Sequence, residues 1–276
     1  MKDTDIKLQV LICTFGKVGI RNIVTADHPH VDGVEYLVSW QLPEGDEPVP
    51  EELVNRPDFK VIKSATRGLS RNRNLALQAA TAPFCLISDD DVHYTSEKLR
   101  LIIDSFEHHP EADIIAFKYA STSDKKWYPD ETFSLAKPPK GYFISSIEIA
   151  FRRENILATG IHFNERFGIG GEYMAGEEDV FIHDALNHNL HGIFIPEFIA
   201  THNHASTGVR HNATPAFIRT KGATFVHTHP HTWPLRMLLH ALRHNSPDLS
   251  RFQYIKQWLD GATAERKISF NCKHRH

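Results

Sequence analysis

Cysteine is scarce in this chain of 276 residues, which has only 3, at Cys13, Cys85 and Cys272. No CxxC pair or other zinc-finger spacing occurs, so the sequence gives no support to a structural zinc site of that kind. Cys13 and Cys85 lie in short apolar runs, where a free cysteine behaves as a small hydrophobic residue. A reducing compartment, the cytoplasm, is therefore the expected location.

Long hydrophobic runs are also missing. No apolar stretch approaches the roughly 20 residues that a membrane-spanning helix needs. The first ten residues, MKDTDIKLQV, are polar and lead directly into a strand-like run, unlike a secretory signal peptide. We therefore expect neither a membrane span nor a signal peptide.

The chain has no excess of basic residues and no phosphate-loop motif. Its formal net charge is −3, which gives no general attraction to nucleic acid. Gly168, Gly170 and Gly171 do not make a GxGxxG sequence, and no Walker motif occurs, so dinucleotide binding and P-loop hydrolysis have no support. With 41% hydrophobic and 24% charged residues, the composition is that of a globular protein with one large domain, alone or with an extension.

The most informative stretch is FCLISDDDVHY, residues 84–94. A short apolar run of this kind predicts a strand buried on both faces, and Asp89, Asp90 and Asp91 follow it at once. Ligands of open α/β sheets bind beyond the carboxyl ends of the strands. Three adjacent carboxylates repel one another, and Mg²⁺ or Mn²⁺ would relieve this while also holding substrate phosphates. The alternative is a solvated turn, where aspartate is common.

Strand-like runs alternate with helical patterns along the chain, which predicts βαβ units and a mostly parallel sheet. Between residues 120 and 140 the chain is polar, aromatic and proline-rich, which is typical of a long functional loop. The strands are expected at residues 8–13, 35–40, 59–63, 84–87, 114–119, 143–151 and 192–199. The helices are expected at residues 19–26, 70–80, 97–109 and 153–159, and after Gly176.

Arg67, Arg71 and Arg73 crowd the start of the second of these helices, with Ser70 as the expected N-cap. A helix N-terminus surrounded by positive side chains is a natural anion site. The alternative is a basic, solvated helix end. This helix leads back into the strand before the three aspartates, so its start opens on the same edge of the sheet.

The helix after Gly176 begins with acids. Glu178 heads an apolar stripe made by Phe181, Ile182 and Ala185, whereas Asp179 heads a mixed stripe. Acids in a first helical turn also stabilise the helix dipole and need no catalytic role. Two histidines, His202 and His204, follow the last strand and are candidates for metal or phosphate contacts.

The last forty residues form a basic, amphipathic tail. From Arg236 to the end there are eight Lys or Arg residues against three acids. Such a tail can cover the sheet or rest on an anionic membrane surface. Its apolar residues are Trp233, Leu235, Met237, Leu238, Leu239 and Trp258.

Several of these motifs agree in type and order with one family. A first strand ending in Thr14, then GLSRNRNLAL, DDD, GEED and a His-containing loop, resemble the nucleotide-sugar glycosyltransferases of family 2. The resemblance covers about residues 8–208 and implies an α/β, GT-A (Rossmann-like) fold with a mixed, mostly parallel sheet flanked by helices. It implies a catalytic domain at 1–208, divided into a nucleotide-sugar half (about 1–119) and an acceptor half (about 120–208). A helical extension is expected at 209–276.

The resemblance also implies roles for particular residues. Those expected at the nucleotide sugar are Thr14, Arg67, Ser70, Arg71, Asp89 and Asp90. Those expected at the Mg²⁺ or Mn²⁺ ion are Asp91, Asp89 and His204, with His202 as the alternative to His204. Glu178 or Asp179 would be the general base, and the apolar stripe favours Glu178. The second strand of the family usually ends in acids that hold the base, but here it ends Ser39, Trp40, Gln41, so the donor nucleotide stays open.

The implied activity is inverting transfer of a sugar from a nucleotide-diphosphate sugar to a hydroxyl of a saccharide or lipid-linked acceptor. Surface polysaccharide or glycoconjugate synthesis is the expected context. The location would be cytoplasmic, with peripheral contact between the tail and the inner membrane face. Two alternatives remain: another Mg²⁺-dependent nucleotide-sugar or nucleotidyl transferase, and a non-catalytic carbohydrate-binding protein.

Overall fold

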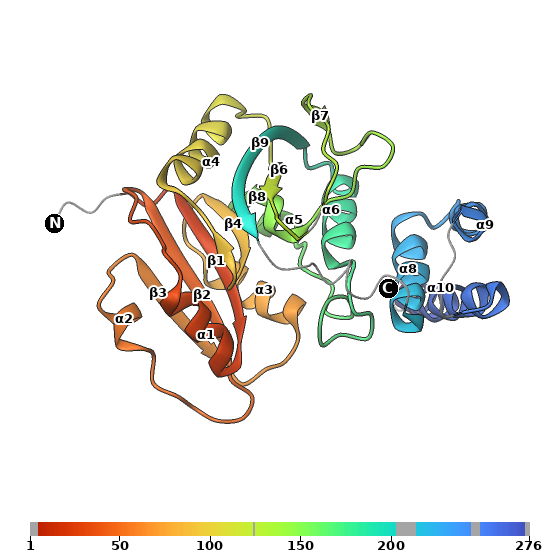
Figure 1. Ribbon diagram of the computed structural model, residues 1–276. Helices are drawn as coiled ribbons and strands as arrows, with labels where there is room; N and C mark the ends of the chain where they lie inside the picture. The colour runs from red at the N-terminus through yellow and green to blue at the C-terminus, as the bar shows by residue number, and fades with distance from the viewer. Residues whose placement is uncertain (1–4, 124, 203–213, 244–248, 274–276) are drawn as a thin grey trace.

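A mixed sheet forms the centre of the molecule, and helices cover its faces (Figure 1). The computed structural model describes residues 5–123, 125–202, 214–243 and 249–273. Within these residues the sheet has nine strands in the order β3-β2-β1-β4-β8-β6-β9-β5, and β7 pairs with β9.

The half of the sheet that ends at β4 is parallel throughout. Its strands are β1 (Leu8–Phe15), β2 (Val34–Gln41), β3 (Phe59–Ser64) and β4 (Phe84–Asp89). The helices between them are α1 (Gly16–Thr25), α2 (Glu51–Val54) and α3 (Leu69–Ala79). Cys13 of β1 lies beside Asp89 of β4, so the first strand and the three aspartates end at the same edge, as the sequence predicted.

The other half of the sheet is mixed. Strand β8 is antiparallel to both β4 and β6, whereas β6 and β9 are parallel. The strands are β5 (Val92–His93), β6 (Ile114–Ala120), β7 (Phe133–Ser134), β8 (Ile149–Arg152) and β9 (Gly192–His202). The helices are α4 (Ser96–His108), α5 (Arg153–Thr159) and α6 (Glu177–Asn187).

Both faces of the sheet are buried. Along β1, Val10 and Ile12 pack into one apolar cluster, while Leu11 and Cys13 pack into a second cluster. Strand side chains alternate between the faces, so a run that is apolar at every position must be covered on both sides. The α/β fold class predicted from the sequence is confirmed.

Two local predictions were wrong. The strand expected at residues 143–151 begins only at Ile149, after a short 3₁₀ helix η1 (Ser146–Glu148). Here Glu148 accepts a bond from the Ser145 amide in a capping box, which the apolar pattern did not indicate. Ser70 is not an N-cap either, because α3 starts at Leu69 and the cap is Gly68, whose φ of 108° favours glycine.

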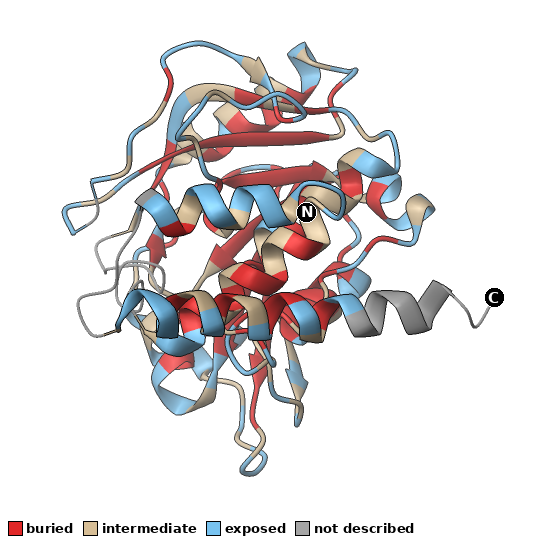
Figure 2. Ribbon diagram, turned by 90° about the vertical axis from the view of Figure 1, so that its right-hand side faces the viewer, coloured by how far each residue is buried: buried red, intermediate tan, exposed pale blue. Residues whose placement is uncertain are grey.

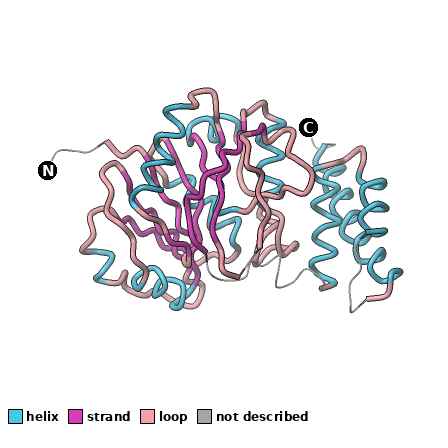
Figure 3. Tube along the Cα trace, turned by 45° about the horizontal axis from the view of Figure 1, so that its top comes forward, coloured by secondary structure: helices cyan, strands magenta, loops and turns pink. Residues whose placement is uncertain are grey.

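The C-terminal extension is a set of helices with its own small core (Figure 3). It comprises α8 (Pro215–Thr228), α9 (Trp233–Arg243) and α10 (Arg251–Lys273). A Cβ at Gly222 would collide with the carbonyl of Trp258, and a Cβ at Gly261 with that of Arg219. Glycine at these two positions therefore allows the close approach of α8 and α10.

The extension does not cover the sheet, which was one of two expectations for the tail. It packs beside α6 through α8, at the end of the molecule opposite β3 (Figure 1). Among the described residues, no helix combines the length and apolar character needed to cross a membrane.

Candidate active site

A cleft of about 1590 Å³ opens at the carboxyl ends of β1 and β4. Its lining comes from the sheet-containing part of the chain and from helices α8 and α9 of the extension. In the described part of the chain, the carboxylates that line it lie on two elements only: the end of β4 and the start of α6. They are Asp89, Asp90, Asp91, Glu177, Glu178 and Asp179.

Asp90 is turned toward α1. Its Oδ2 accepts a hydrogen bond from Thr14 Oγ1 at 2.5 Å, and its Oδ1 accepts one from Asn22 Nδ2 at 3.2 Å. A Cβ at Gly19 would collide with both Thr14 and Asp90, so glycine is required there for this contact. Thr14 and Asp90 both line the cleft, as expected, but they are bonded to each other and fix the start of α1.

Asp91 lies beside His202, because β5 pairs with the end of β9 just after the aspartates. The Nε2 atom of His202 is 3.2 Å from Asp91 Oδ2. Asp89, on the other side of Asp90, also lines the cleft. Carboxylates and an imidazole are ligand types suited to Mn²⁺ or Mg²⁺. Among the described residues, however, only His183, Asp184 and His227 bring three such ligand atoms within 4.8 Å of one another. His204, the first choice from the sequence, lies outside the described residues, and His202, the alternative, lies beside Asp91.

Arg73 connects the two acidic elements, a role that the sequence reading missed. Its Nη2 donates to Asp89 Oδ1 at 3.2 Å and to Ser146 Oγ at 2.9 Å, and its Nη1 donates to Glu177 Oε1 at 2.7 Å. Only 2% of the Arg73 side chain is exposed. A signal for this was present: Arg73 stands three and four residues before Ala76 and Leu77, on the buried stripe of α3.

Arg71 and Ser70 do not reach the cleft, contrary to expectation. The Arg71 guanidinium lies on the outer face of α3, where its Nη2 is 2.6 Å from Glu165 Oε2. The Ser70 hydroxyl is buried and donates to the carbonyl of Phe167 at 2.5 Å. These two side chains fasten α3 to residues 165–171, and neither lines the cleft.

Where β1 and β2 end, the cleft has Phe15, Arg67 and Gln41 in its lining. The Arg67 guanidinium lies 5.5 Å from the centre of the Phe15 ring and also pairs with Glu44. Gln41 donates through Nε2 to Thr66 Oγ1 and to the carbonyl of Gly68. Arg67 and Gln41 therefore both lie at the cleft, and the contact of Arg67 with a nucleotide sugar stays a prediction.

Glu177, Glu178 and Asp179 all line the cleft at the start of α6, but Glu177 is buried and bonded to Arg73. Burial, together with the charges of Glu177 and Asp179, raises the pKa of Glu178. Asp179 is exposed to the cleft, and its position inside the cleft together with the charge of Glu177 raises its pKa as well. We expected the helix N-terminus to keep Glu178 ionised; enclosure and like charges outweigh that effect.

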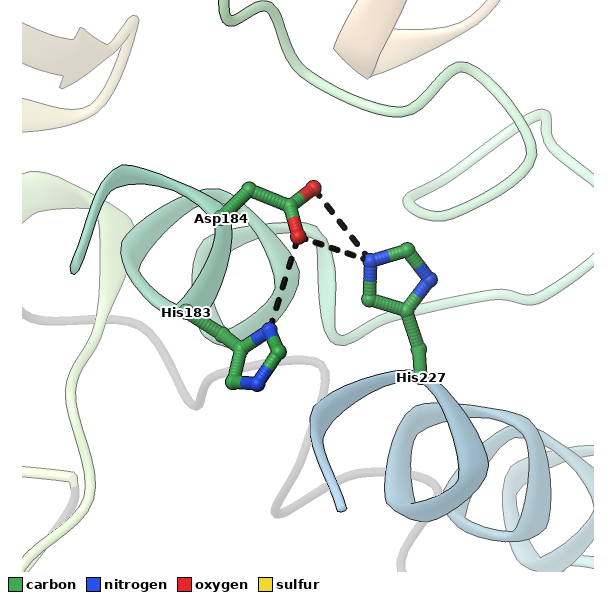
Figure 4. A group of neighbouring side chains, drawn as sticks. All are labelled: His183, Asp184 and His227. Atoms are coloured by element: carbon green, nitrogen blue, oxygen red, sulfur yellow. Dashed lines mark hydrogen bonds and ion pairs between the residues drawn. The ribbon is translucent and has the colours of Figure 1, made fainter. Parts of the chain in front are cut away.

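A second cluster lies where α6 meets the extension (Figure 4). His183, Asp184 and His227 bring three potential metal-ligand atoms within 4.8 Å of one another. His227 Nε2 is 3.0 Å from Asp184 Oδ1, and its Nδ1 is 3.4 Å from Glu265 Oε1. Because both ring nitrogens of His227 face carboxylates, the geometry favours an imidazolium in an ion-pair network that joins α6, α8 and α10.

This network predicts a pH dependence of stability. Burial alone would lower the pKa of His227, but the bonds to Asp184 and Glu265 outweigh it and raise the value to about 9. The stabilisation is therefore complete below pH ~6.5 and is lost as the pH rises toward 9, at up to about 1.4 kcal/mol per pH unit. Urea unfolding curves at pH 6, 7.5 and 9 should show this loss, and His227→Gln should remove it. His162→Gln, at an exposed histidine, is the control and should leave the loss unchanged.

The same network contributes at acidic pH. Burial would raise the pKa of Asp184, but the bonds from His183 and His227 lower it to about 2. Its stabilisation is therefore present above the pKa of an unfolded aspartate and is lost as the pH falls from about 4 toward 2.

A His227→Gln variant that keeps the wild-type loss of stability between pH 6.5 and 9 would contradict the ion-pair interpretation.

Comparison with solved structures gives the same fold. TarS of S. aureus, residues 1–349, alone and in complex with UDP, superposes with a TM-score of 0.60 at 17% identity, over 95% of this chain and 91% of that chain. The mannosyltransferase PcManGT from Pyrobaculum calidifontis, in complex with GDP-Man and Mn²⁺, gives a TM-score of 0.53 at 15% identity, over 98% and 76%. A longer TarS structure is also similar, and this chain covers 43% of the length of that TarS chain.

Comparison of the sequence with known proteins finds one relative that matches over part of its length, and one family model that matches part of this chain. A segment of 122 residues is 29% identical to eIF-2-alpha kinase GCN2 of Schizosaccharomyces pombe; it is 42% of this chain but 7% of that protein, and it assigns no activity here. Residues 45–176, which include α3, the three aspartates and the loop before α6, match the model of Glycosyl transferase family 2. This match covers just under half of the chain, and together with the shared fold it makes the chain similar to glycosyltransferase family 2.

Proposed function

We propose that this protein transfers a sugar from a nucleotide-diphosphate sugar to an acceptor hydroxyl with inversion at the anomeric carbon. One observation carries the proposal: a single cleft is lined by a carboxylate–histidine group at the end of β4 and by two further carboxylates at the start of α6. The first group suits a metal-bound diphosphate, and the second suits a general base.

Asp91, Asp89 and His202 would hold a Mg²⁺ or Mn²⁺ ion. When bound, the ion would neutralise charge on the diphosphate and so make the nucleotide a better leaving group. Arg73 keeps Asp89 in place and adds one buried positive charge behind the aspartates. Because Arg73 holds Asp89 in position, this carboxylate does not depend on a bound ion for its place in the fold.

Glu178 is the proposed base. Its carboxylate would take the proton of the acceptor hydroxyl while the hydroxyl oxygen forms a bond to the anomeric carbon. The bond from that carbon to the diphosphate oxygen breaks, and the nucleoside diphosphate leaves on the opposite face. The sugar is inverted in one step, and the proton ends on Glu178.

The solved neighbours support the donor class. TarS has been solved with UDP and with UDP-GlcNAc, and PcManGT with GDP-Man and Mn²⁺. For this chain the nucleotide stays open, since Gln41 replaces the usual acid and can both donate and accept hydrogen bonds.

The acceptor side of the cleft supports a saccharide or lipid-linked acceptor. Tyr142 and Phe143, which follow the long loop region, line the cleft, and Phe143 is exposed. Aromatic rings with an exposed face are suited to apolar contact with a sugar ring. Surface polysaccharide or glycoconjugate synthesis at the cytoplasmic membrane face is the proposed context.

A panel of donors tests the function. The protein is incubated with UDP-, GDP- and dTDP-sugars and Mn²⁺, and slow release of the free sugar is followed. Hydrolysis of one nucleotide class, lost on addition of EDTA, is expected. Release of pyrophosphate from a nucleoside triphosphate instead would favour a nucleotidyltransferase, and binding of saccharides without any turnover would favour a carbohydrate-binding protein.

Loss of the proposed metal ligand Asp91 should weaken donor binding. Asp91→Ala should weaken Mn²⁺-dependent binding of UDP or GDP by about tenfold or more, because it removes the ligand that lies beside His202. Titration calorimetry with and without EDTA measures this. Asp130→Ala is the control, since that side chain is 99% exposed and outside the cleft. Equal affinity in Asp91→Ala and wild type would contradict the metal role.

A further inference from the structure

Helix α9 carries a row of exposed leucines. Its members lie at spacings of three and four residues, on one face of the helix, and between 41% and 61% of each is exposed. They are Leu235, Leu238, Leu239 and Leu242, and we call them the leucine face of α9. In Figure 2, which looks onto this end of the molecule, exposed and intermediate residues make up nearly all of α9.

The opposite face of α9 is already used for packing. Trp233, Met237 and Ala241 belong to the core of the extension, and His240 Nδ1 is 3.0 Å from the hydroxyl of Tyr254. At 100° per residue, these positions are centred about 180° from the leucine face. One face of α9 therefore packs against the rest of the extension, and the second apolar face, the leucine face, is exposed.

Basic residues lie on α9 and on the next helix, α10. In the sequence from Trp233 to Leu259 there are four Lys or Arg residues and one acid. Among those with described side chains, Arg236, Arg251 and Lys256 are exposed. An amphipathic helix with an apolar face and surrounding positive charge is the form that binds at the surface of an anionic bilayer.

We propose that the leucine face of α9 inserts into the headgroup region of an anionic membrane, so that the enzyme is a peripheral membrane protein. The apolar side chains would enter the lipid, while Arg236, Arg251 and Lys256 add attraction to lipid phosphates. No part of this binding depends on the transferase reaction.

A second copy of the chain fits this surface less well. In a symmetric dimer the same patch meets itself, so the basic residues of the two copies would come together. An 11-residue helix is also only about 16 Å long, and its face alone is small beside the roughly 800 Å² per partner of a typical interface. Charge and size both favour lipid.

The cleft lies on another side of α9. Arg236 and His240, which line the cleft wall that the extension contributes, are both more than 90° around the helix from the leucine face. A membrane held at the leucine face would therefore leave the cleft uncovered.

Vesicle sedimentation tests the proposal. The full chain is mixed at low salt with phosphatidylcholine vesicles that contain 30% phosphatidylglycerol, and with vesicles of phosphatidylcholine alone. We expect binding to the anionic vesicles that falls at 0.5 M NaCl. Leu235→Ser/Leu238→Ser should lower the partition coefficient about tenfold or more, because two apolar contacts are lost.

Val54→Ser is the matched control, since this valine is 65% exposed on α2 at a distance from the extension, and it should bind as wild type does. Circular dichroism of the double variant confirms that the helices are retained. Loss of binding confined to the leucine variant supports the proposal. No binding of the wild type to anionic vesicles overturns it, and so does a dimer in sedimentation velocity that only the leucine variant disrupts. Donor hydrolysis, measured in parallel without lipid, reports on the proposed function separately.

Discussion

Glu178→Gln is expected to lower turnover by about 10² to 10⁴ while leaving the dissociation constant of the donor nearly unchanged. Glu178 lies in the cleft, partly enclosed, whereas Glu177 is bonded to Arg73 and is not free to take a proton. Glutamine keeps the shape but removes the basic oxygen, so the loss should appear in the chemical step and spare nucleotide binding.

The dependence of the rate on pH should also show that Glu178 is the base. Burial and the charges of Glu177 and Asp179 raise the pKa of Glu178. The base acts only when ionised, so the rate should fall as the pH drops through this raised value, above the pH at which an ordinary glutamate protonates. Single-turnover rates from pH 5 to 8 would measure this limb.

Asp179→Asn is the internal comparison and should lose less activity, because Asp179 is the more exposed of the two. Glu154→Gln, at an exposed position on α5, should behave as wild type. A dead Asp179→Asn beside an active Glu178→Gln would identify Asp179 as the base. Full activity in both variants would contradict the proposed mechanism itself.

The sequence predicted the features that depend on neighbouring residues. The run from Phe84 to Ile87 is apolar at every position, and a strand buried on both faces follows directly from that. The place of the aspartates at the sheet edge followed in turn, since parallel strands share the edge where ligands bind. The helix after Gly176 was equally clear from its glycine and its acids.

What the sequence could not give were contacts between distant segments. Arg71 and Arg73 look alike in GLSRNRN, but one meets Glu165 and the other meets Glu177. Glu148, in a run predicted to be a strand, is fully buried and pairs with Lys126 instead. Each outcome is decided by a partner at least twenty residues away, which no local pattern contains.

Arg71 and Arg73 have different partners, so substituting one or the other should change the stability of the protein by very different amounts. Arg73→Met should lower the free energy of unfolding by about 3 to 5 kcal/mol, because it leaves the buried carboxylate of Glu177 without its charge partner. Arg71→Met should cost at most about 1 kcal/mol, since its pair with Glu165 lies at the surface and water screens it. Urea unfolding followed by circular dichroism gives both values.

A double variant separates the ion pair from simple packing. Arg73→Met combined with Glu177→Met removes both charges, so much of the lost stability should return. If the double variant is as unstable as the sum of its single variants, Arg73 contributes through packing instead. Equal losses of stability in Arg71→Met and Arg73→Met would mean that the buried bridge between β4 and α6 does not form.

The affinity for the donor is a second measurement. It should weaken in Arg73→Met, where Asp89 loses its partner, and stay unchanged in Arg71→Met, whose guanidinium lies outside the cleft.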